Sequence, residues 1–165
     1  MARTERVTFD GELERLYREH GDRLWRAVLA YSGDPDVASD AVSEAFAQAL
    51  RRGDGIRDPE AWVWRATFRI AAGDLADRRR RAATTHAPGP VTYDIPQPAD
   101  ELIAALAHLS PKQRACVVLH HYAGYPVKET AVIVGSTAAA VRVHLSQGRK
   151  RLRAILESHR ESDDA

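Results

Sequence analysis

The chain has 165 residues, 28% of them charged, and a formal net charge of +1, which suits one ordinary domain or two small helical ones. A single cysteine, Cys116, excludes an internal disulfide, and no apolar run approaches the length of a membrane span. The N-terminus lacks the apolar core of a signal peptide, so we expect a cytoplasmic protein with no membrane insertion.

The small net charge hides a segregation of charge along the chain. Residues 1–60 carry nine basic and 13 acidic groups, residues 61–81 carry six and two, and residues 137–165 carry six and four. Affinity for duplex DNA follows the number of phosphates that the protein neutralises. A chain with separate acidic and basic surfaces should therefore bind DNA weakly alone and need a partner to deliver it.

Three helices are expected in the first half of the chain. The first covers Asp10 to Tyr31 and places on one face Leu13, Leu16, Tyr17, Leu24 and Val28. The second opens at Asp34-Pro35, an N-cap followed by proline at the first helical position, and ends at Gly53 and Gly55. Its apolar residues recur at steps of three and four: Val37, Ala38, Ala41, Val42, Ala45 and Ala49. Asp58-Pro59 repeats the start signal for a third helix, from Pro59 to about Arg81.

Residues 82–99 read A-A-T-T-H-A-P-G-P-V-T-Y-D-I-P-Q-P-A, with four prolines and no apolar period, and predict a linker. Fully extended, this segment spans ~60 Å at ~3.3 Å per residue. That reach lets two domains occupy sites ~1.5 duplex turns apart. A plain interdomain tether explains the composition equally well.

A helical hairpin and a basic helix are expected in the second half. Ser110-Pro111-Lys112-Gln113 is another start signal, with Gln113 placed to complete a capping box. Ala131, Gly135 and Val141 hold the positions where a helix-turn-helix needs a small residue, a turn residue with positive φ and an apolar anchor. No β-type alternation of useful length occurs. The predicted fold class is therefore all-α, with two small helical domains joined by a flexible linker.

The basic helix is amphipathic. One stripe should face the core and consists of Ala138, Val141, Leu145, Gly148 and Leu152. The opposite side carries residue types suited to a DNA groove, where Arg and Gln pair with base edges and Val touches a thymine methyl. They are Ala139, Arg142, Val143, Ser146, Gln147 and Lys150, while Arg149, Lys150, Arg151 and Arg153 suit phosphates. The alternative is a solvated basic helix that caps a bundle.

Cys116 and His120 stand four residues apart with His121 adjacent, a spacing that presents soft ligands to zinc. No second ligand pair follows at metal spacing, so a small buried cysteine with the histidines at the edge of the hairpin is favoured. We expect no metal site and no cofactor.

One pattern runs through the last third of the chain and consists of Leu109, Pro111, Arg114, Val117, Gly124, Glu129, Ala131, Gly135, Thr137, Val141, Arg142, Leu145, Arg149 and Leu152. It resembles region 4, the C-terminal DNA-binding region of bacterial RNA polymerase sigma factors. The chain departs from the family pattern at Val143 and His144, where Ser and Arg are common, and at Pro126, where a capping Ser is common.

The first half completes this resemblance. Asp40-Ala41-Val42-Ser43-Glu44-Ala45-Phe46 is similar to a signature of sigma region 2, with Ser43 where Gln is usual. The helix that begins Pro59-Glu60-Ala61-Trp62-Val63-Trp64-Arg65 and ends Arg78-Arg79-Arg80-Arg81 is similar to the helix that follows it in the family. With regions 2 and 4 alone, the chain is identified as a member of the extracytoplasmic-function (group 4) sigma factors of the sigma-70 family.

The resemblance implies a domain plan: region 2 at 1–81, the linker at 82–99, region 4 at 100–158 and a tail at 159–165. It implies that the polymerase β′ clamp is bound by Asp40, Ser43, Glu44 and Phe46, and that region 4 meets the β flap. The implied contacts to the −10 promoter element are Arg57, Trp64, Arg65, Phe68, Arg69, Arg78 and Arg79. Those to the −35 element are Thr137, Ala139, Arg142, Val143, Ser146, Gln147, Arg149, Lys150 and Arg151.

The aromatic residues of the third helix have two interpretations. Trp64 and Phe68 can stack on unpaired bases while the arginines track the phosphate backbone. Core packing is the favoured interpretation for Trp62. We expect Trp64 and Phe68, on a different side of the helix, to be less easily buried.

The predicted function is a promoter-specificity subunit that binds core RNA polymerase, recognises the −10 and −35 elements and directs transcription initiation. An anti-sigma factor is an expected partner. We expect no enzyme, because the chain has no Gly-rich phosphate loop and no nucleophile with its base. The alternative is a free-standing dimeric helix-turn-helix regulator that acts without polymerase, which would leave the region 2 signature and the long linker without a purpose.

Overall fold

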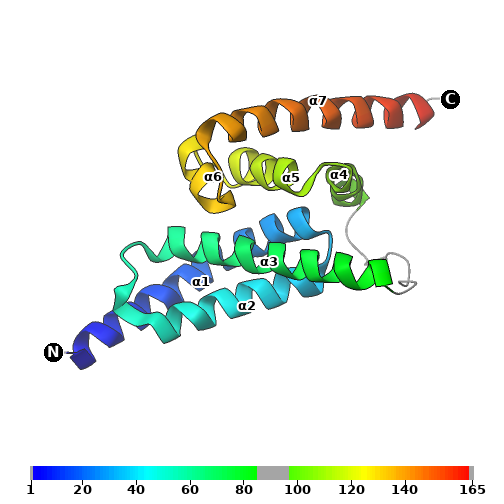
Figure 1. The fold of residues 1–165 in the computed structure, drawn as a ribbon. Helices are drawn as coiled ribbons and strands as arrows, with labels where there is room; N and C mark the ends of the chain where they lie inside the picture. Colours follow the sequence, from blue (N-terminus) through cyan, green and yellow to red (C-terminus); the bar gives the residue numbers. More distant parts are fainter. Residues whose placement is uncertain (1, 85–96, 164–165) are drawn as a thin grey trace.

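The computed structural model describes residues 2–84 and 97–163, and all its regular elements in these ranges are helical. In chain order they are α1 (Ala2–Ser32), α2 (Pro35–Arg52), the 3-10 turn η1 (Gly53–Gly55), α3 (Pro59–Thr84), α4 (Gln97–Ala107), α5 (Pro111–Val117), the π-helical turn η2 (Val118–Tyr122), α6 (Val127–Val134) and α7 (Ala138–Asp163). In Figure 1, α1, α2 and α3 form one group, and α4 to α7 lie against it. The all-α fold class is confirmed, whereas most of the predicted linker, residues 85–96, lies outside the described residues.

The bundle of α1, α2 and α3 follows from local signals in the sequence. The carboxylate of Asp34 caps α2 by accepting hydrogen bonds from the backbone N–H groups of Asp36 at 2.8 Å and Val37 at 3.2 Å. Gly53 ends α2 with a φ of 64°, a conformation that favours glycine. The predicted apolar stripe of α2 is buried along its whole length, from Val37 to Ala49.

The bounds of two helices and the exposure of Tyr17 differ from the sequence predictions for this bundle. The helix α1 begins at Ala2 instead of Asp10, and α3 continues three residues beyond Arg81 to Thr84. Tyr17, predicted on the buried face of α1, is 56% exposed because it lies on the flank, where its ring meets Phe46 edge-on. The other four predicted core residues of α1 are buried, as expected.

Capping also defines the helices of the second group. The Ser110 hydroxyl accepts from the backbone N–H of Gln113 at 3.3 Å, and the Gln113 side chain accepts from the backbone N–H of Ser110 at 3.2 Å. This reciprocal pair is the predicted capping box at the start of α5. Gly135 ends α6 in the left-handed conformation, with φ 65° and ψ 48°, as the helix-turn-helix pattern requires.

Helices α5 and α7 cross closely at Gly148. A Cβ atom placed on Gly148 would lie 2.9 Å from Cγ2 of Val117 and 3.7 Å from Cβ of Gln113. Contacts of about 3.5–4.0 Å are normal between carbon atoms, so a side chain at position 148 would push α5 away. The absence of a side chain there therefore sets the spacing of the two helices.

The two groups of helices share one apolar core and are joined by polar contacts. The guanidinium of Arg114 in α5 donates to the backbone carbonyl of Tyr31 in α1 at 2.9 Å. In the opposite direction, Arg23 of α1 donates to the carbonyl of Ala123, just after η2, at 2.6 Å. No helix in the described ranges is long and apolar enough to cross a membrane.

Candidate nucleic-acid interface

The α6–turn–α7 unit presents one continuous exposed face on α7. Val141 and Leu145 are buried, whereas all six predicted groove-facing residues are exposed: Ala139, Arg142, Val143, Ser146, Gln147 and Lys150. Arg149 and Arg151, predicted as phosphate contacts, are exposed as well. The amphipathic orientation deduced at 100° per residue is therefore correct for α7.

Two of the predicted −35 residues already make hydrogen bonds within the protein. The hydroxyl of Thr137 accepts from the backbone N–H of Ala140 at 3.1 Å, so it caps the start of α7. The side-chain carbonyl of Gln147 accepts from the side-chain amide of Gln113 at 3.1 Å. Sequence reasoning recognised Gln113 as a capping residue but missed its contact with α7, because the two residues lie 34 positions apart.

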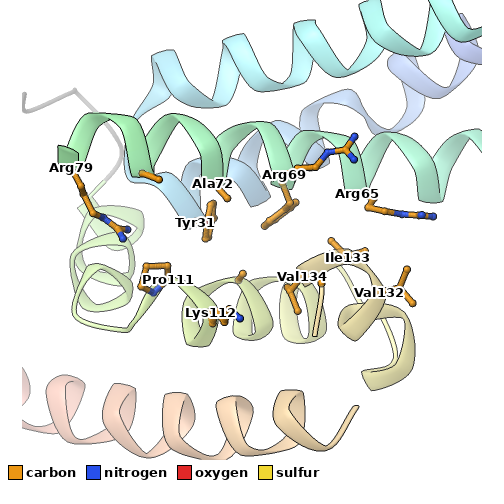
Figure 2. A pocket seen from close by; sticks show the side chains of 14 residues that line it. Tyr31, Arg65, Arg69, Ala72, Arg79, Pro111, Lys112, Val132, Ile133 and Val134 are labelled. Atoms are coloured by element: carbon orange, nitrogen blue, oxygen red, sulfur yellow. The ribbon is translucent and has the colours of Figure 1, made fainter. Parts of the chain in front are cut away.

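Three arginines of α3 lie at the boundary between this helix and the second group of helices. Arg65, Arg69 and Arg79 are exposed and line a groove of about 550 Å³ between α3 and the α5–α6 region, which Figure 2 shows from close by. Lys112 of α5 adds a fourth cationic side chain to this groove. Four cations without an acidic residue in the lining give the groove a positive potential, which suits a phosphate backbone.

The remaining −10 candidates on and near α3 are placed differently. Arg57 is exposed in the loop just before α3. Arg78 forms an ion pair with Asp34, the N-cap of α2, at 2.5 Å. A phosphate contact by Arg78 would therefore compete with this ion pair, whereas Arg57 forms no ion pair with any of the described residues.

Trp64 and Phe68 are buried, with 2% and 4% of their surface exposed. The Trp64 ring meets Tyr125 at 5.4 Å between ring centroids, and Phe68 meets Tyr31 at 5.4 Å. The expectation that these two rings are less easily buried than Trp62 is wrong, since Trp62 is only half-buried. Tyr125, which follows η2, covers the Trp64 ring, although the two residues lie about 60 positions apart in the sequence.

Arg114 and Arg23 anchor the arrangement that buries these rings. Arg114 is 9% exposed, its guanidinium carbon lies 5.7 Å from the centre of the Tyr31 ring, and burial lowers its pKa from the ordinary value. Burial also raises the pKa of Tyr31, with the charge of Arg114 acting in the opposite direction. Both arginines bind carbonyls at helix ends, which carry the partial negative charge of the helix dipole. Sequence analysis did not predict this role for either residue.

The signature on α2 divides into exposed and engaged residues. Asp40 and Ser43 are exposed. The Glu44 carboxylate accepts from Gln48 at 2.9 Å and from Arg51 at 2.7 Å, and these hydrogen bonds lower its pKa. Phe46 is buried and packs edge-on against the exposed ring of Tyr17. Within this signature, Asp40 therefore has the carboxylate that is not hydrogen-bonded to a neighbouring side chain.

Cys116 is a buried free thiol, and burial raises its pKa to about 11. A ring nitrogen of His120 lies 2.8 Å from the carbonyl of Tyr125, which orients the imidazole toward the backbone. The interpretation of Cys116 as a small buried residue is confirmed. Among the described residues, no group of three or more histidine, cysteine, aspartate and glutamate side chains has the arrangement of a metal site.

Comparison with known proteins agrees with this geometry. The family model for sigma-70 region 2 matches residues 16–84, and the model for sigma-70 region 4 matches residues 99–152. The ECF RNA polymerase sigma factor SigL of Mycobacterium tuberculosis is 30% identical over 161 residues, covering 88% of this chain and 89% of that protein. The RNA polymerase sigma-E factor of Streptomyces avermitilis is 31% identical over 154 residues, covering 89% of this chain and 86% of that protein. The chain belongs to the extracytoplasmic-function sigma factors.

Two solved structures share the fold of this sigma factor. The sigma factor RpoE of Bartonella quintana, solved with the anti-sigma factor NepR, superimposes with a TM-score of 0.70 at 22% identity over 87% of this chain and 98% of that chain. CnrH, solved with the cytosolic domain of CnrY, gives a TM-score of 0.68 at 23% identity over 95% of each chain.

The sigma factor is thus a promoter-specificity subunit that binds core RNA polymerase and promoter DNA. Its relatives match along nearly the whole chain, so a free-standing dimeric regulator is not favoured. The matched segments end close to the predicted domain limits at 81 and 100, which stay predictions at residue level.

Proposed function

We propose that residues 1–81 of this sigma factor dock on the polymerase clamp and read the −10 element, and that residues 100–158 read the −35 element and meet the β flap. The observation that carries the proposal is the exposed face of α7 beside a correctly formed helix-turn-helix turn at Gly135. A helix with one buried stripe and one basic exposed face fits the major groove.

On α7, we assign base reading to Arg142 and backbone contact to Arg151. Both are exposed, but Arg142 lies in the first turns of the helix and Arg151 lies more than two turns further on. In helix-turn-helix proteins the N-terminal residues of the reading helix meet base edges.

The experiment is run-off transcription with core polymerase on the promoter of the gene's own operon and on single-base variants of its −35 element. Arg142→Ala should cost about 1–3 kcal/mol at one base pair and relax the preference there. Arg151→Ala is the matched control, which should weaken all variants alike and reduce the salt slope by about one. Equal loss from every variant with Arg142→Ala would make Arg142 a backbone contact.

For the −10 element, we propose that the α5–α6 side moves away from α3 before Trp64 and Phe68 meet unpaired bases. The support is their burial under Tyr125 and beside Tyr31. Stacking of a base on an aromatic ring contributes about 1–3 kcal/mol, which only an uncovered ring can supply. Phe68→Leu keeps an apolar side chain in the core but removes the stacking ring, so it should reduce permanganate reactivity of the melted strand while closed complexes persist. Permanganate footprints as strong as those of the parent protein would show that the Phe68 ring acts only as a core residue.

For polymerase docking, we assign the central role to Asp40, with Ser43 beside it. Glu44 is already bound to Gln48 and Arg51, so a clamp arginine would have to displace them. Phe46 is buried and contributes to this docking face through its edge-on packing against Tyr17.

We propose further that this sigma factor acts in the cytoplasm as a non-catalytic initiation factor under the control of an anti-sigma protein. Support comes from RpoE, whose structure was solved with the anti-sigma factor NepR. The test is co-purification with a small protein encoded beside it, followed by transcription with and without that protein. Full transcription in its presence would argue against such control.

A further inference from the structure

Gln147, on the exposed face of α7, is held by Gln113 of α5. The Nε2 group of Gln113 donates to Oε1 of Gln147 at 3.1 Å, and Oε1 of Gln113 accepts from the backbone N–H of Ser110 at 3.2 Å. Both distances are those of ordinary N–H···O hydrogen bonds. Two consecutive bonds therefore connect the capping box of α5 to the proposed DNA-reading face.

The direction of this chain of bonds is fixed by its first member. A backbone N–H only donates, so the group of Gln113 that faces Ser110 must be its carbonyl. The NH₂ group of Gln113 then faces Gln147, so the group of Gln147 that accepts this hydrogen bond must be its side-chain carbonyl. The NH₂ group of Gln147 is left to point away from Gln113, and Gln147 is exposed.

The close crossing of α5 and α7 makes this contact possible. Gly148 follows Gln147 directly, and a Cβ on it would lie 2.9 Å from Val117 and 3.7 Å from Cβ of Gln113. Without a side chain at position 148, the two helices approach closely enough for two glutamine side chains to meet. The capping box in turn holds the Gln113 side chain at the first turn of α5.

We propose that Gln113 is a positioning residue that decides which type of base Gln147 selects, an inference that rests on the proposed role of α7 in reading the −35 element. With its carbonyl engaged, Gln147 offers a hydrogen-bond donor to the major groove. Guanine O6 and N7, thymine O4 and adenine N7 accept hydrogen bonds there, whereas cytosine presents only its N4 amino donor. Gln147 therefore favours a keto base, guanine or thymine. Cytosine offers its NH₂ group no acceptor, and adenine offers one acceptor, N7, beside an amino donor that needs the engaged carbonyl of Gln147 for bidentate pairing.

The decisive variant is Gln113→Glu. A glutamate at this position keeps the capping box, because its carboxylate accepts from the Ser110 N–H as the amide carbonyl does. Its other oxygen can only accept, so the Gln147 amide must turn over and present its NH₂ group to Glu and its carbonyl to DNA. The preference should then change from a keto base to an amino base, adenine or cytosine, at one position.

The assay uses holoenzyme assembled from core polymerase and the full-length variants. It measures enrichment of fragments of the operon's own promoter that are randomised in the −35 element. We expect the keto-to-amino ratio at one position to fall about three- to tenfold with Gln113→Glu, the effect of one hydrogen bond. The added negative charge weakens binding to every sequence alike and cancels in this ratio. Circular dichroism checks that the variant is folded.

The control is the same substitution in a Gln147→Ala background, where the ratio should not respond to Gln113→Glu. Gln113→Ala should leave the Gln147 amide free to turn and so reduce the preference without reversing it. An unchanged keto preference in Gln113→Glu, or a uniform loss of affinity without a change of ratio, overturns the inference while the proposed function stands. A parent holoenzyme with no base preference anywhere in the −35 element overturns the reading role of α7 itself.

Discussion

Replacing Gly148 by alanine tests whether the crossing of α5 and α7 depends on a missing side chain. Gly73, in the middle of α3, offers the matched control, because a Cβ placed there meets no atom within 4 Å. Both substitutions add one methyl group inside a long helix. They differ in what that methyl group meets.

The magnitudes follow from two opposing effects. Alanine favours the helix over glycine by about 0.8–1.0 kcal/mol, so Gly73→Ala should stabilise the protein by roughly that amount. At Gly148 the same gain is offset by an overpacked contact of 2.9 Å with Val117. Overpacking by a methyl group costs about 1–3 kcal/mol. Gly148→Ala should therefore be neutral to destabilising by about 2 kcal/mol, and clearly less stable than Gly73→Ala.

Urea denaturation followed by two signals measures this difference. All three tryptophans lie in the first group of helices, at positions 25, 62 and 64, and the Trp64 ring packs against Tyr125 of the second group. Because the two groups share one core, the Gly148→Ala effect should appear both in tryptophan fluorescence and in far-UV circular dichroism, which reports all helices. In a Val117→Ala background the added methyl group has room, so Gly148→Ala should become stabilising there. The reasoning fails if Gly148→Ala is as stable as Gly73→Ala in the presence of Val117.

Three further predictions concern the docking face, the contact between the helix groups and the core of the sigma factor. Asp40→Ala should weaken binding to core polymerase in a pull-down more than Glu44→Ala does, because Glu44 is engaged within α2; equal effects would contradict the docking assignment. Replacing Arg23 and Arg114 together by Ala should increase the radius of gyration in small-angle scattering, since the hydrogen bonds between the two helix groups are lost. An unchanged radius of gyration would show that apolar contacts alone hold the two helix groups together. Burial raises the pKa of Cys116 from 9.0 to about 11, so the stability that the protonated thiol contributes is complete below pH 9 and is lost as the pH rises toward 11. The unfolding free energy of Cys116→Ala should therefore fall less over that pH range than that of the parent protein. Identical dependence of the unfolding free energy on pH in the two proteins would contradict the burial argument.

Features encoded by a few neighbouring residues could be predicted from the sequence. The caps at Asp34 and at Ser110 with Gln113, and the positive φ at Gly135, depend on residue types within four positions of each other. The exposed face of α7 followed from helical periodicity in the same way. These local signals fix the helices and the orientation of the reading helix.

Contacts between distant segments could not be predicted in this way. Trp64 and Phe68 look like residues on a second face of α3, and their burial depends on Tyr125 and Tyr31, which other helices bring near. Gln113 has a sufficient local explanation as a capping residue, so nothing in its neighbourhood indicates a contact with Gln147. Helical periodicity shows that a side is apolar or exposed, but it does not show which helix will cover it.

The bonds from Arg23 and Arg114 to main-chain carbonyls also have a consequence for how this protein can evolve. A main-chain acceptor survives any substitution of its own residue, so Tyr31 and Ala123 can change without removing either bond. Neither bond should therefore leave a pair of covarying positions in an alignment. The contact is robust on the acceptor side and sensitive on the donor side, where replacing a single arginine removes an anchor. A single substitution of Arg23 or Arg114 can thus loosen the packing of the two helix groups during evolution, and a single reversion can restore it.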